Sequence, residues 1–366
     1  MKKVGLFFDR TYVDAHYCFT ELARKLAENG YVVDLYYIAN SSNPSPTFFN
    51  DKIRVLEFPV SSFAKIEFWY KVILTNDRKY NFVIATPILG LILAQQVAYF
   101  QKIPLYYLAD EVFDPEIQWH YIKNFDRVKA IEKRINQQCA GTLALGEIRY
   151  AYQKEINSLP DSHPHFILPN SPSSPAERIK TNFLRDLTGI SDNKPIVLFI
   201  GTMYWKLAQR VWEEARNYQN ESFHLVFHMR TVGLTKDFEK HPFIHYSGLP
   251  MPQYLMNYLV SSADLGLVLY EKEDPKESKN GWTGGKIGTY LKNCVPLIAG
   301  NQEIFKRFEE NNVGRFWDGR TEILPLIHET LGDAALLAQH IPSFYEKEYA
   351  YEKFFPTFLQ HIQKGK

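Results

Sequence analysis

Three consecutive residues, Gly284, Gly285 and Lys286, offer the clearest chemistry in the chain. They follow an apolar run and precede a helix-like segment, which predicts a strand-to-helix turn. The first N–H groups of a helix lack intrahelical acceptors, glycine lets a ligand approach the backbone, and lysine adds a positive charge. This combination suits a diphosphate. The same triplet would also serve a helix whose glycines only allow close packing against a sheet, so both interpretations stay open.

Further candidate ligand-binding residues follow the predicted strands of the second half of the chain. Lys206 lies after the strand 196–200 and Arg230 after the next one, so each could place a positive charge near a phosphate. The backbone around Gly248 could pair with the edge of a nucleobase. A solvated loop lysine is the alternative for Lys206, and His228, inside a strand, is expected to be a hydrogen-bonded core residue. The candidate donor-site residues are Gly201, Thr202, Lys206, Arg230, Leu249, Pro250, Thr283, Gly284, Gly285, Lys286 and Thr289.

The first half of the chain offers candidate catalytic residues in comparable positions. His16 lies in the loop after the first strand, and Asp110 and Glu111 follow the predicted strand 103–108. One of these residues, or Asp14, could act as a general base toward an acceptor hydroxyl. The alternatives are structural, because carboxylates cap helices well and His16 could simply belong to its loop.

Short β-branched and aromatic runs alternate with helix-like segments along the whole chain. This alternation predicts an α/β protein with mainly parallel sheets covered by helices on both faces. Ligands of such sheets bind beyond the carboxyl ends of the strands, which is where the candidate residues lie. The predicted strands span residues 4–9, 32–38, 53–58, 82–85, 103–108, 142–146, 166–168, 196–200, 224–229, 243–247, 265–269, 295–299 and 314–316.

A chain of 366 residues is too long for one hydrophobic core and predicts two domains. The Ser/Pro-rich segment 170–175 interrupts the strand–helix alternation, which then restarts near residue 195. We therefore predict two Rossmann-like doubly wound domains that face each other across a cleft. The predicted bounds are 1–170 for the N-terminal domain, 171–194 for a linker with a helix over 176–187, 195–346 for the C-terminal domain, and 347–366 for a helix, interrupted at Pro356, that joins the N-terminal domain.

The composition argues against several classes of function. Forty-two basic and 41 acidic side chains give a formal net charge of +1, so the chain has no overall attraction to nucleic acid. Cys18, Cys139 and Cys294 lie far apart, which excludes a disulfide scaffold and favours a reducing cytosol. The eleven histidines form no HExxH motif, and no Walker loop or GxGxxG motif occurs. We expect a cytoplasmic protein that needs no metal or other cofactor.

Two apolar segments raise the question of membrane contact. Residues 81–101 carry no charge and are long enough to span a bilayer, but Pro87, Gly90 and two glutamines favour a strand, a turn and a helix instead. Residues 63–74 interleave aromatic side chains with lysines. As a helix, this segment would either rest on a membrane surface or bury its aromatic face in the core of a domain.

The motifs resemble, in order, those of GT-B glycosyltransferases, in particular the large retaining family that uses nucleotide sugars (glycosyl transferases group 1, family 4-like). Each motif alone is common, but the ordered set spans nearly the whole chain. The matching pieces of the second half are Phe199–Thr202, Phe243–Pro250, Ala263-Asp264, Gly285-Lys286, Tyr290-Leu291 and Val295–Ile298. Those of the first half are Leu22–Val33 and Leu108–Glu111.

The chain departs from this family at several functional positions. Two glutamates of the family, eight positions apart, correspond to Gly281 and Thr289, and Thr289 could bind a ribose hydroxyl only weakly. Thr202 replaces an arginine of the family's phosphate clamp, and Asp110 replaces a histidine of the acceptor-side loop. These substitutions leave the donor open and leave room for an inactive member.

The resemblance implies a glycosyltransferase of polysaccharide biosynthesis. Such an enzyme moves a sugar from a nucleoside-diphosphate sugar to a glycan or lipid-linked acceptor, here with retention favoured over inversion. The alternatives are a UDP-sugar epimerase of the same architecture and a non-catalytic partner or scaffold protein. The expected partners are a nucleotide sugar, a saccharide acceptor and a peripheral membrane surface, with no nucleic acid. The sequence leaves open the nucleotide, the sugar, the acceptor and the oligomeric state.

Overall fold

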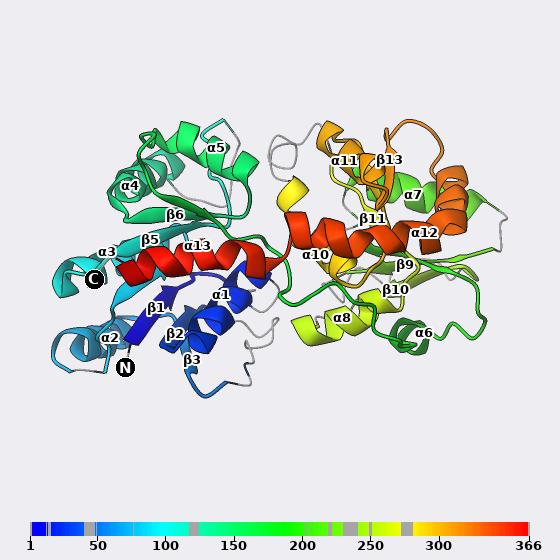
Figure 1. Cartoon of the computed structure of the whole chain (residues 1–366). Helices are drawn as coiled ribbons and strands as arrows, with labels where there is room; N and C mark the ends of the chain where they lie inside the picture. Colours follow the sequence, from blue (N-terminus) through cyan, green and yellow to red (C-terminus); the bar gives the residue numbers. More distant parts are fainter. Residues whose placement is uncertain are drawn as a thin grey trace. The chain divides into compact units, whose positions relative to one another are not determined.

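The chain divides into two compact units, Met1–Pro169 with Phe354–Lys366 and Asn170–Lys353 (Figure 1). A computed structural model describes residues 2–11, 13, 16–39, 48, 50–75, 77–116, 124–201, 203, 205–218, 222–229, 241–248, 251–271 and 281–364.

The described part of the N-terminal unit contains one parallel sheet with the strand order β3-β2-β1-β4-β5-β6-β7. The order changes direction between β1 and β4, the point at whose carboxyl edge parallel sheets of this kind usually bind ligands. The strands are β1 (Lys2–Phe7), β2 (Tyr31–Tyr37), β3 (Ile53–Glu57), β4 (Phe82–Ala85), β5 (Leu105–Ala109), β6 (Gly141–Ala144) and β7 (His165–Ile167). The helices are α1 (Tyr17–Glu28), α2 (Ser62–Ile73), α3 (Leu89–Gln101), α4 (Phe125–Gln138), α5 (Glu147–Asn157) and most of α13 (Tyr351–Lys364).

The described part of the C-terminal unit repeats this design with the strand order β10-β9-β8-β11-β12-β13, again all parallel. Here the order changes direction between β8 and β11. The strands are β8 (Ile196–Ile200), β9 (His224–His228), β10 (Ile244–Ser247), β11 (Leu265–Val268), β12 (Leu297–Gly300) and β13 (Gly314–Trp317). The helices are α6 (Phe183–Thr188), α7 (Lys206–Asn217), α8 (Gln253–Ser261), α10 (Gly285–Lys292), α11 (Lys306–Glu310) and α12 (Leu324–Glu348), with single 3₁₀ turns η3 (Gly281–Thr283) and η4 (Glu303–Phe305).

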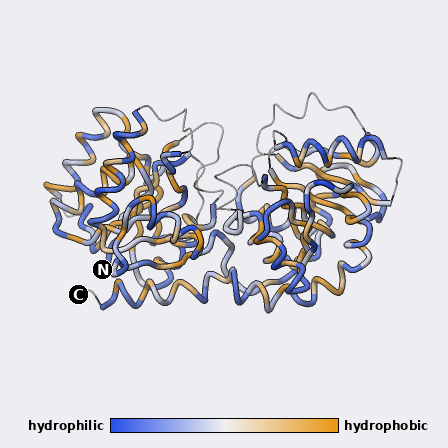
Figure 2. Tube along the Cα trace, turned by 90° about the horizontal axis from the view of Figure 1, so that it is seen from above, coloured by the Kyte–Doolittle hydropathy of each residue, from blue (hydrophilic) through white to orange (hydrophobic). Residues whose placement is uncertain are grey.

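Local sequence explains how the first crossover forms. Leu22, Ala23 and Leu26 recur at helical spacing along α1 and are fully buried. Gly30 ends the segment with a φ of +86°, a left-handed conformation that glycine adopts at little cost. The strands on either side are almost entirely buried, because helices cover both faces of the sheet. Figure 2 shows hydrophobic and hydrophilic residues interspersed along the trace of each unit.

The predicted α/β class and the predicted strands are confirmed. Each predicted strand is present, with bounds that differ by at most a few residues, and β4 and β8 have the predicted bounds. Residues 81–101 form a strand, a turn and a helix, β4 followed by α3, as expected. Among the described residues, no helix is both long enough and apolar enough to cross a bilayer.

The segment after Asn170 differs from the expected helix over 176–187. Only Phe183–Thr188 is helical. Before it, the backbone is bonded to other elements: the N–H of Glu177 donates to the carbonyl of Lys292, and the N–H of Ile179 donates to the hydroxyl of Ser261. The segment 171–194, expected to be a linker, thus packs on the ends of α8 and α10 within the C-terminal unit.

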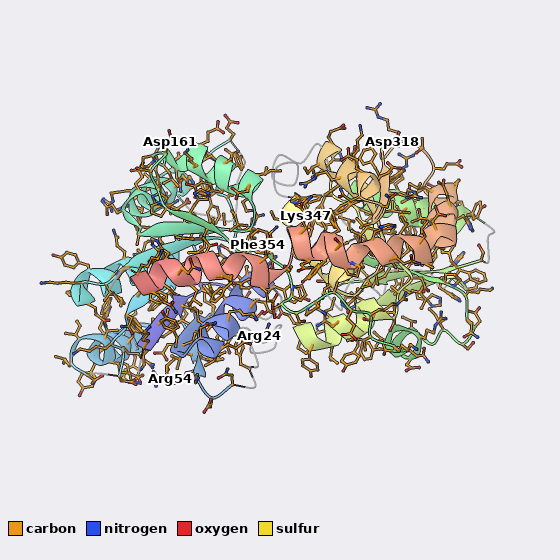
Figure 3. The ribbon with its side chains drawn as sticks, viewed as in Figure 1. Arg24, Arg54, Asp161, Asp318, Lys347 and Phe354 are labelled. Atoms are coloured by element: carbon orange, nitrogen blue, oxygen red, sulfur yellow. The ribbon has the colours of Figure 1, made fainter. Side chains whose placement is uncertain are left out.

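The expected break at Pro356 is wrong. The chain instead leaves helical conformation at Tyr349 and Ala350, between α12 and α13, and Pro356 lies inside α13. Pro356 is the sixth residue of α13, where it removes the hydrogen bond that an N–H at this position would donate, and the helix continues past it. Phe354, labelled in Figure 3, is the first residue of the segment that belongs again to the N-terminal unit.

Candidate functional site

The strand order of the C-terminal unit reverses between β8 and β11, and the ammonium group of Lys286 lies beside the carboxyl end of β8. Gly201 directly follows β8, and its N–H donates to the carbonyl of His228 at 3.1 Å. A Cβ atom at Gly201 would lie 2.7 Å from the ring of Phe199 and 3.3 Å from the Nζ of Lys286. Gly201 therefore leaves room for the ammonium group at the end of the first strand of this sheet.

Three aromatic rings enclose this ammonium group. The Nζ of Lys286 lies 4.0 Å from the ring centroid of Trp205, 4.4 Å from that of Tyr270 and 5.6 Å from that of Phe199. The atom is shielded from solvent. The electron-rich faces of aromatic rings stabilise a cation, by about 0.5–2 kcal/mol for each favourable contact, so the enclosure can hold a positive charge in a water-poor place. We call Phe199, Trp205 and Tyr270 the aromatic enclosure.

The start of α10 lies beside the aromatic enclosure. Gly284 is the residue before the helix, and the N–H of Gly285, the first helical residue, has no acceptor within the helix. A Cβ atom at Gly284 would lie 2.1 Å from the hydroxyl oxygen of Tyr270, and one at Gly285 would lie 2.9 Å from the Nδ2 of Asn170. Close packing is therefore one function of these glycines. It also brings the positive end of the helix next to Lys286.

The positions that correspond to the missing glutamates have little space. A Cβ atom at Gly281 would lie 2.4 Å from the Oε1 of Gln302, so no larger residue fits there unless Gln302 moves. Thr289 is buried on α10, and its hydroxyl donates to the carbonyl of Gly285 at 2.8 Å. Thr283, in η3, is also buried. The surroundings of Gly281 thus match the residue that is present.

Lys206 is the first residue of α7 and its side chain is exposed. Its backbone N–H donates to the carboxylate of Glu271, which lies just beyond β11. A carboxylate of the chain itself therefore occupies the start of α7, where negative charge is favoured.

Other predicted donor-site residues have mixed outcomes. Thr202, Arg230, Leu249 and Pro250 lie outside the described residues. His228 is a buried, hydrogen-bonded residue as expected, with its Nδ1 3.1 Å from the hydroxyl oxygen of Ser247.

In the N-terminal unit, the loop after β1 is tied to the loop after β4. The carboxylate of Asp9 accepts hydrogen bonds from the hydroxyl of Thr86 at 2.9 Å and from the N–H groups of Ile88 and Leu89 at 2.9 and 2.7 Å. Leu89 is the first residue of α3, so Asp9, in the loop after β1, caps this helix.

Arg10 connects this cap to the predicted catalytic residue Asp110. Its Nε and Nη2 donate to the two carboxylate oxygens of Asp110 at 2.8 and 3.1 Å, and its Nη1 donates to Asp9 at 2.8 Å. Arg149 donates to the backbone carbonyl of Asp110. Burial raises the pKa of Asp110, and the positive charge of Arg10 opposes this effect. Asp110 is thus held in a buried ion pair at the carboxyl edge of the sheet.

The other two acceptor-side candidates are more accessible. Glu111 follows Asp110 and is half-buried. His16 is the residue before α1, its carbonyl accepts the N–H of Phe19 at 3.1 Å, and its ring lies 5.8 Å from that of Phe19. Asp14 lies outside the described residues.

Sequence reasoning missed four residues that shape the two sites: Arg10, Trp205, Tyr270 and Gln302. Trp205 precedes Lys206, and Tyr270 ends an apolar run, so each could have been noted as an aromatic residue at the end of a strand or the start of a helix. No pattern in the sequence indicates that both rings contact Lys286. Among the described residues, no group of three or more His, Cys, Asp or Glu side chains could hold a metal ion.

No protein-family model matches the chain, and no curated protein matches it. The chain is similar to the solved structure of sucrose-phosphate synthase from Thermosynechococcus elongatus, with 12% identity, coverage of 100% of this chain and 99% of the other, and a TM-score of 0.74. It is similar to Anabaena HepE in complex with UDP and glucose, with 12% identity, 100% coverage of both chains and a TM-score of 0.69. A putative UDP-N-acetylglucosamine 2-epimerase from Listeria monocytogenes is similar with 12% identity, coverage of 93% and 91%, and a TM-score of 0.54. At this identity the similarities show the fold, and the chain has the GT-B fold.

Proposed function

We propose that this protein is a glycosyltransferase whose C-terminal unit binds a nucleoside-diphosphate sugar. The observation that carries the proposal is the position of the Lys286 ammonium group. It lies within the aromatic enclosure, next to Gly201 at the end of β8 and beside the start of α10. A cation and a helix N-terminus at the point where the strand order reverses are suited to a diphosphate.

The proposed chemistry follows from this geometry. In glycosyl transfer, the bond between the sugar carbon and the diphosphate oxygen breaks, and the leaving diphosphate keeps the electron pair. A fixed positive charge in a water-poor site stabilises this developing negative charge, by about 3–4 kcal/mol for one well-placed donor. Because the aromatic enclosure already holds the Lys286 ammonium group, little reorganisation is needed when the bond breaks.

The acceptor then forms the new bond to the sugar carbon. We propose the retaining course, in which the departing phosphate takes the proton of the acceptor hydroxyl. Both carboxylate oxygens of Asp110 accept hydrogen bonds from Arg10, so Asp110 is better placed to fix the loop after β5 than to remove a proton. An inverting reaction would instead use Glu111 or His16 as the base. The acceptor class is a glycan or a lipid-linked saccharide.

Uridine is the first nucleotide to test, because HepE structures contain UDP and UDP-glucose. A thermal-shift panel of UDP, GDP and dTDP would identify the nucleotide. A ligand at one hundred times its dissociation constant stabilises the folded state by about 2.7 kcal/mol. We expect a clear rise in melting temperature with one diphosphate and a smaller rise with the monophosphate. No response to any nucleotide would contradict the proposal and favour a non-catalytic partner protein.

Product analysis separates transfer from epimerisation. With the nucleotide sugar selected by the panel and a mixture of glycan and lipid-linked acceptors, a transferase releases nucleoside diphosphate only when the correct acceptor is present. An epimerase would convert UDP-N-acetylglucosamine without any acceptor, either to the epimeric UDP-sugar or, with uptake of water, to UDP and the epimeric free sugar. Either product would contradict the proposed transfer.

A further inference from the structure

The outer face of α2 exposes a row of large apolar side chains. Phe63, Ile66, Tyr70 and Leu74 are 78%, 69%, 57% and 72% exposed. Their spacing of three or four residues places them on one face of the helix. Residues of this kind usually face a core, so the row is not explained by the fold of the N-terminal unit.

The opposite face of α2 already supplies the contacts that hold the helix to the unit. Phe68 and Val72 are almost fully buried, and the ring of Phe68 meets those of Phe7 and Tyr36 edge to face at 6.0 and 5.6 Å. α2 is therefore apolar on two opposite faces, of which the unit uses one.

The row continues onto the end of α3. The rings of Trp69 and Phe100 meet edge to face at 5.6 Å, and Tyr99 and Phe100 are themselves exposed. We call the exposed residues Phe63, Ile66, Tyr70, Ile73, Leu74, Tyr99 and Phe100 the outer apolar surface.

Positive charge borders the outer apolar surface. Lys71 lies on one flank of α2, and Lys102 follows α3, two residues after Phe100. Glu67 is the single acidic residue of α2, and its carboxylate is 2.5 Å from the Nζ of Lys71. These border residues, two lysines and one glutamate, carry an excess of positive charge that complements anionic headgroups.

We propose that the outer apolar surface docks onto an anionic lipid bilayer. With α2 parallel to the membrane, its outer side chains enter the interface between headgroups and acyl chains while the flanking lysines reach the phosphates. A helix of 12 residues is about 18 Å long, which suits lying on a membrane and not crossing it. The mixture of aromatic side chains and lysines is typical of residues at membrane interfaces.

A second copy of the chain fits this surface less well. In a two-fold symmetric dimer, the same patch faces itself, so the lysine-rich border of one copy would approach that of its partner. Like charges at such an interface oppose association. The proposal goes beyond nucleotide binding, since none of these residues belongs to the candidate donor site, and it can be tested with no nucleotide present.

Vesicle sedimentation tests the proposal with the full chain. Vesicles of phosphatidylcholine alone are compared with vesicles that also contain phosphatidylglycerol. We expect binding to the anionic vesicles that weakens with added salt, and a fall of at least about tenfold in the partition coefficient of the triple variant Phe63→Ser, Ile66→Ser, Leu74→Ser. The double variant Lys71→Gln, Lys102→Gln should lose the preference for anionic vesicles.

A matched control replaces exposed apolar residues elsewhere, Ile148→Ser, Tyr254→Ser and Leu336→Ser, and should bind vesicles like the wild type. Circular dichroism melting would confirm that each variant is folded. The proposal is overturned if the wild-type protein binds neither kind of vesicle, or if the triple variant binds as well as the wild type. So does a wild-type dimer that the triple variant disperses without any vesicle binding. None of these results bears on nucleotide affinity, which is measured separately.

Discussion

The ammonium group of Lys286 is a positive charge held in a place with little water. Its ammonium group is shielded from solvent, yet three aromatic rings surround it. Water would compete with a phosphate for an exposed lysine, whereas the ring faces stabilise the cation in a place that water does not reach. We therefore regard the aromatic enclosure as the feature that fits Lys286 to a diphosphate.

Asp110 offers a test of a buried ion pair. The variant Asp110→Asn keeps the shape of the side chain but leaves Arg10 with less negative charge around it, so we expect a loss of about 2–4 kcal/mol in the free energy of unfolding. Denaturant unfolding measures this loss. Asp161→Asn is the matched control, because Asp161 pairs with Lys154 on the surface and its replacement should change the free energy of unfolding far less. Equal effects of both variants would contradict the buried network.

His245 should make stability depend on pH. Burial, together with the neighbouring His224 and His241, lowers the pKa of His245 from 6.5 to about 4, while Asp192 opposes this shift. Between pH 6.5 and 4 the unfolded chain binds a proton that the folded chain does not, so stability should fall as the pH falls through this range.

In the variant His245→Gln, the number of protons taken up on unfolding in this pH range should fall by up to about one. Unfolding midpoints measured in steps from pH 7 to about 4 would show a shallower slope than in the wild type. The exposed residue His165 serves as the control, through His165→Gln. His224, Asp192 and Lys194 also belong to this cluster, with His224 2.9 Å from His245 and 2.8 Å from Asp192. An unchanged slope in the His245 variant would contradict the assignment.

At the level of elements, the start of α10 depends on the contact between Gly284 and Tyr270. The variant Gly284→Ala would place a Cβ atom 2.1 Å from the Tyr270 hydroxyl oxygen, so we expect a loss of about 1–3 kcal/mol in stability. The second change Tyr270→Phe removes that oxygen and should restore part of the loss. Denaturant unfolding of the two single variants and the double variant measures the coupling. Strictly additive effects would show that the contact does not limit the helix start.

The strands were predictable because each is a short apolar run bounded by turn residues. Phe82–Ala85 and Ile196–Ile200 are clear examples, and burial on both faces makes them apolar throughout. The helix expected over 176–187 forms only from Phe183 onward. The non-helical part before it was not predictable, because its backbone forms hydrogen bonds with Lys292 and Ser261, which are distant in sequence. Local propensity says nothing about such partners.

The candidate site was predictable only in part. Gly201, Gly284 and Lys286 follow from loop position and residue type. The contacts of Trp205 and Tyr270 with Lys286 depend on three separate segments that the fold brings together, so no local pattern reveals them. The same reason hid Arg10, whose partner Asp110 follows β5, a strand far from Arg10 in the sequence.

At the level of the whole molecule, the chain returns to its N-terminal unit through α13. Phe358 is fully buried there, with its ring 5.3 Å from those of Tyr106 and Phe166. Phe358→Ala should therefore cost about 3–5 kcal/mol and lower the melting temperature. The matched variant in the core of the C-terminal unit is Phe305→Ala, which also removes a buried phenylalanine ring.

Nucleotide titration distinguishes the two core variants. Because the donor site belongs to the C-terminal unit, we expect Phe358→Ala to keep nearly wild-type affinity for nucleoside diphosphate at a temperature where it is folded. Phe305→Ala, which packs near Tyr270, should weaken it. A stronger effect of Phe358→Ala than of Phe305→Ala would contradict the assignment of nucleotide binding to the C-terminal unit.

The most direct test of the account is calorimetric titration of UDP into the wild type and the variant Lys286→Met. Methionine keeps the length of the side chain and packs well against aromatic rings, so the variant should melt close to the wild-type temperature. Lys180→Met, at an exposed position, is the control. We predict that Lys286→Met weakens UDP binding by at least about tenfold, because the positive charge near the diphosphate is lost. UDP binding of equal affinity in the wild type and in Lys286→Met would contradict the central claim.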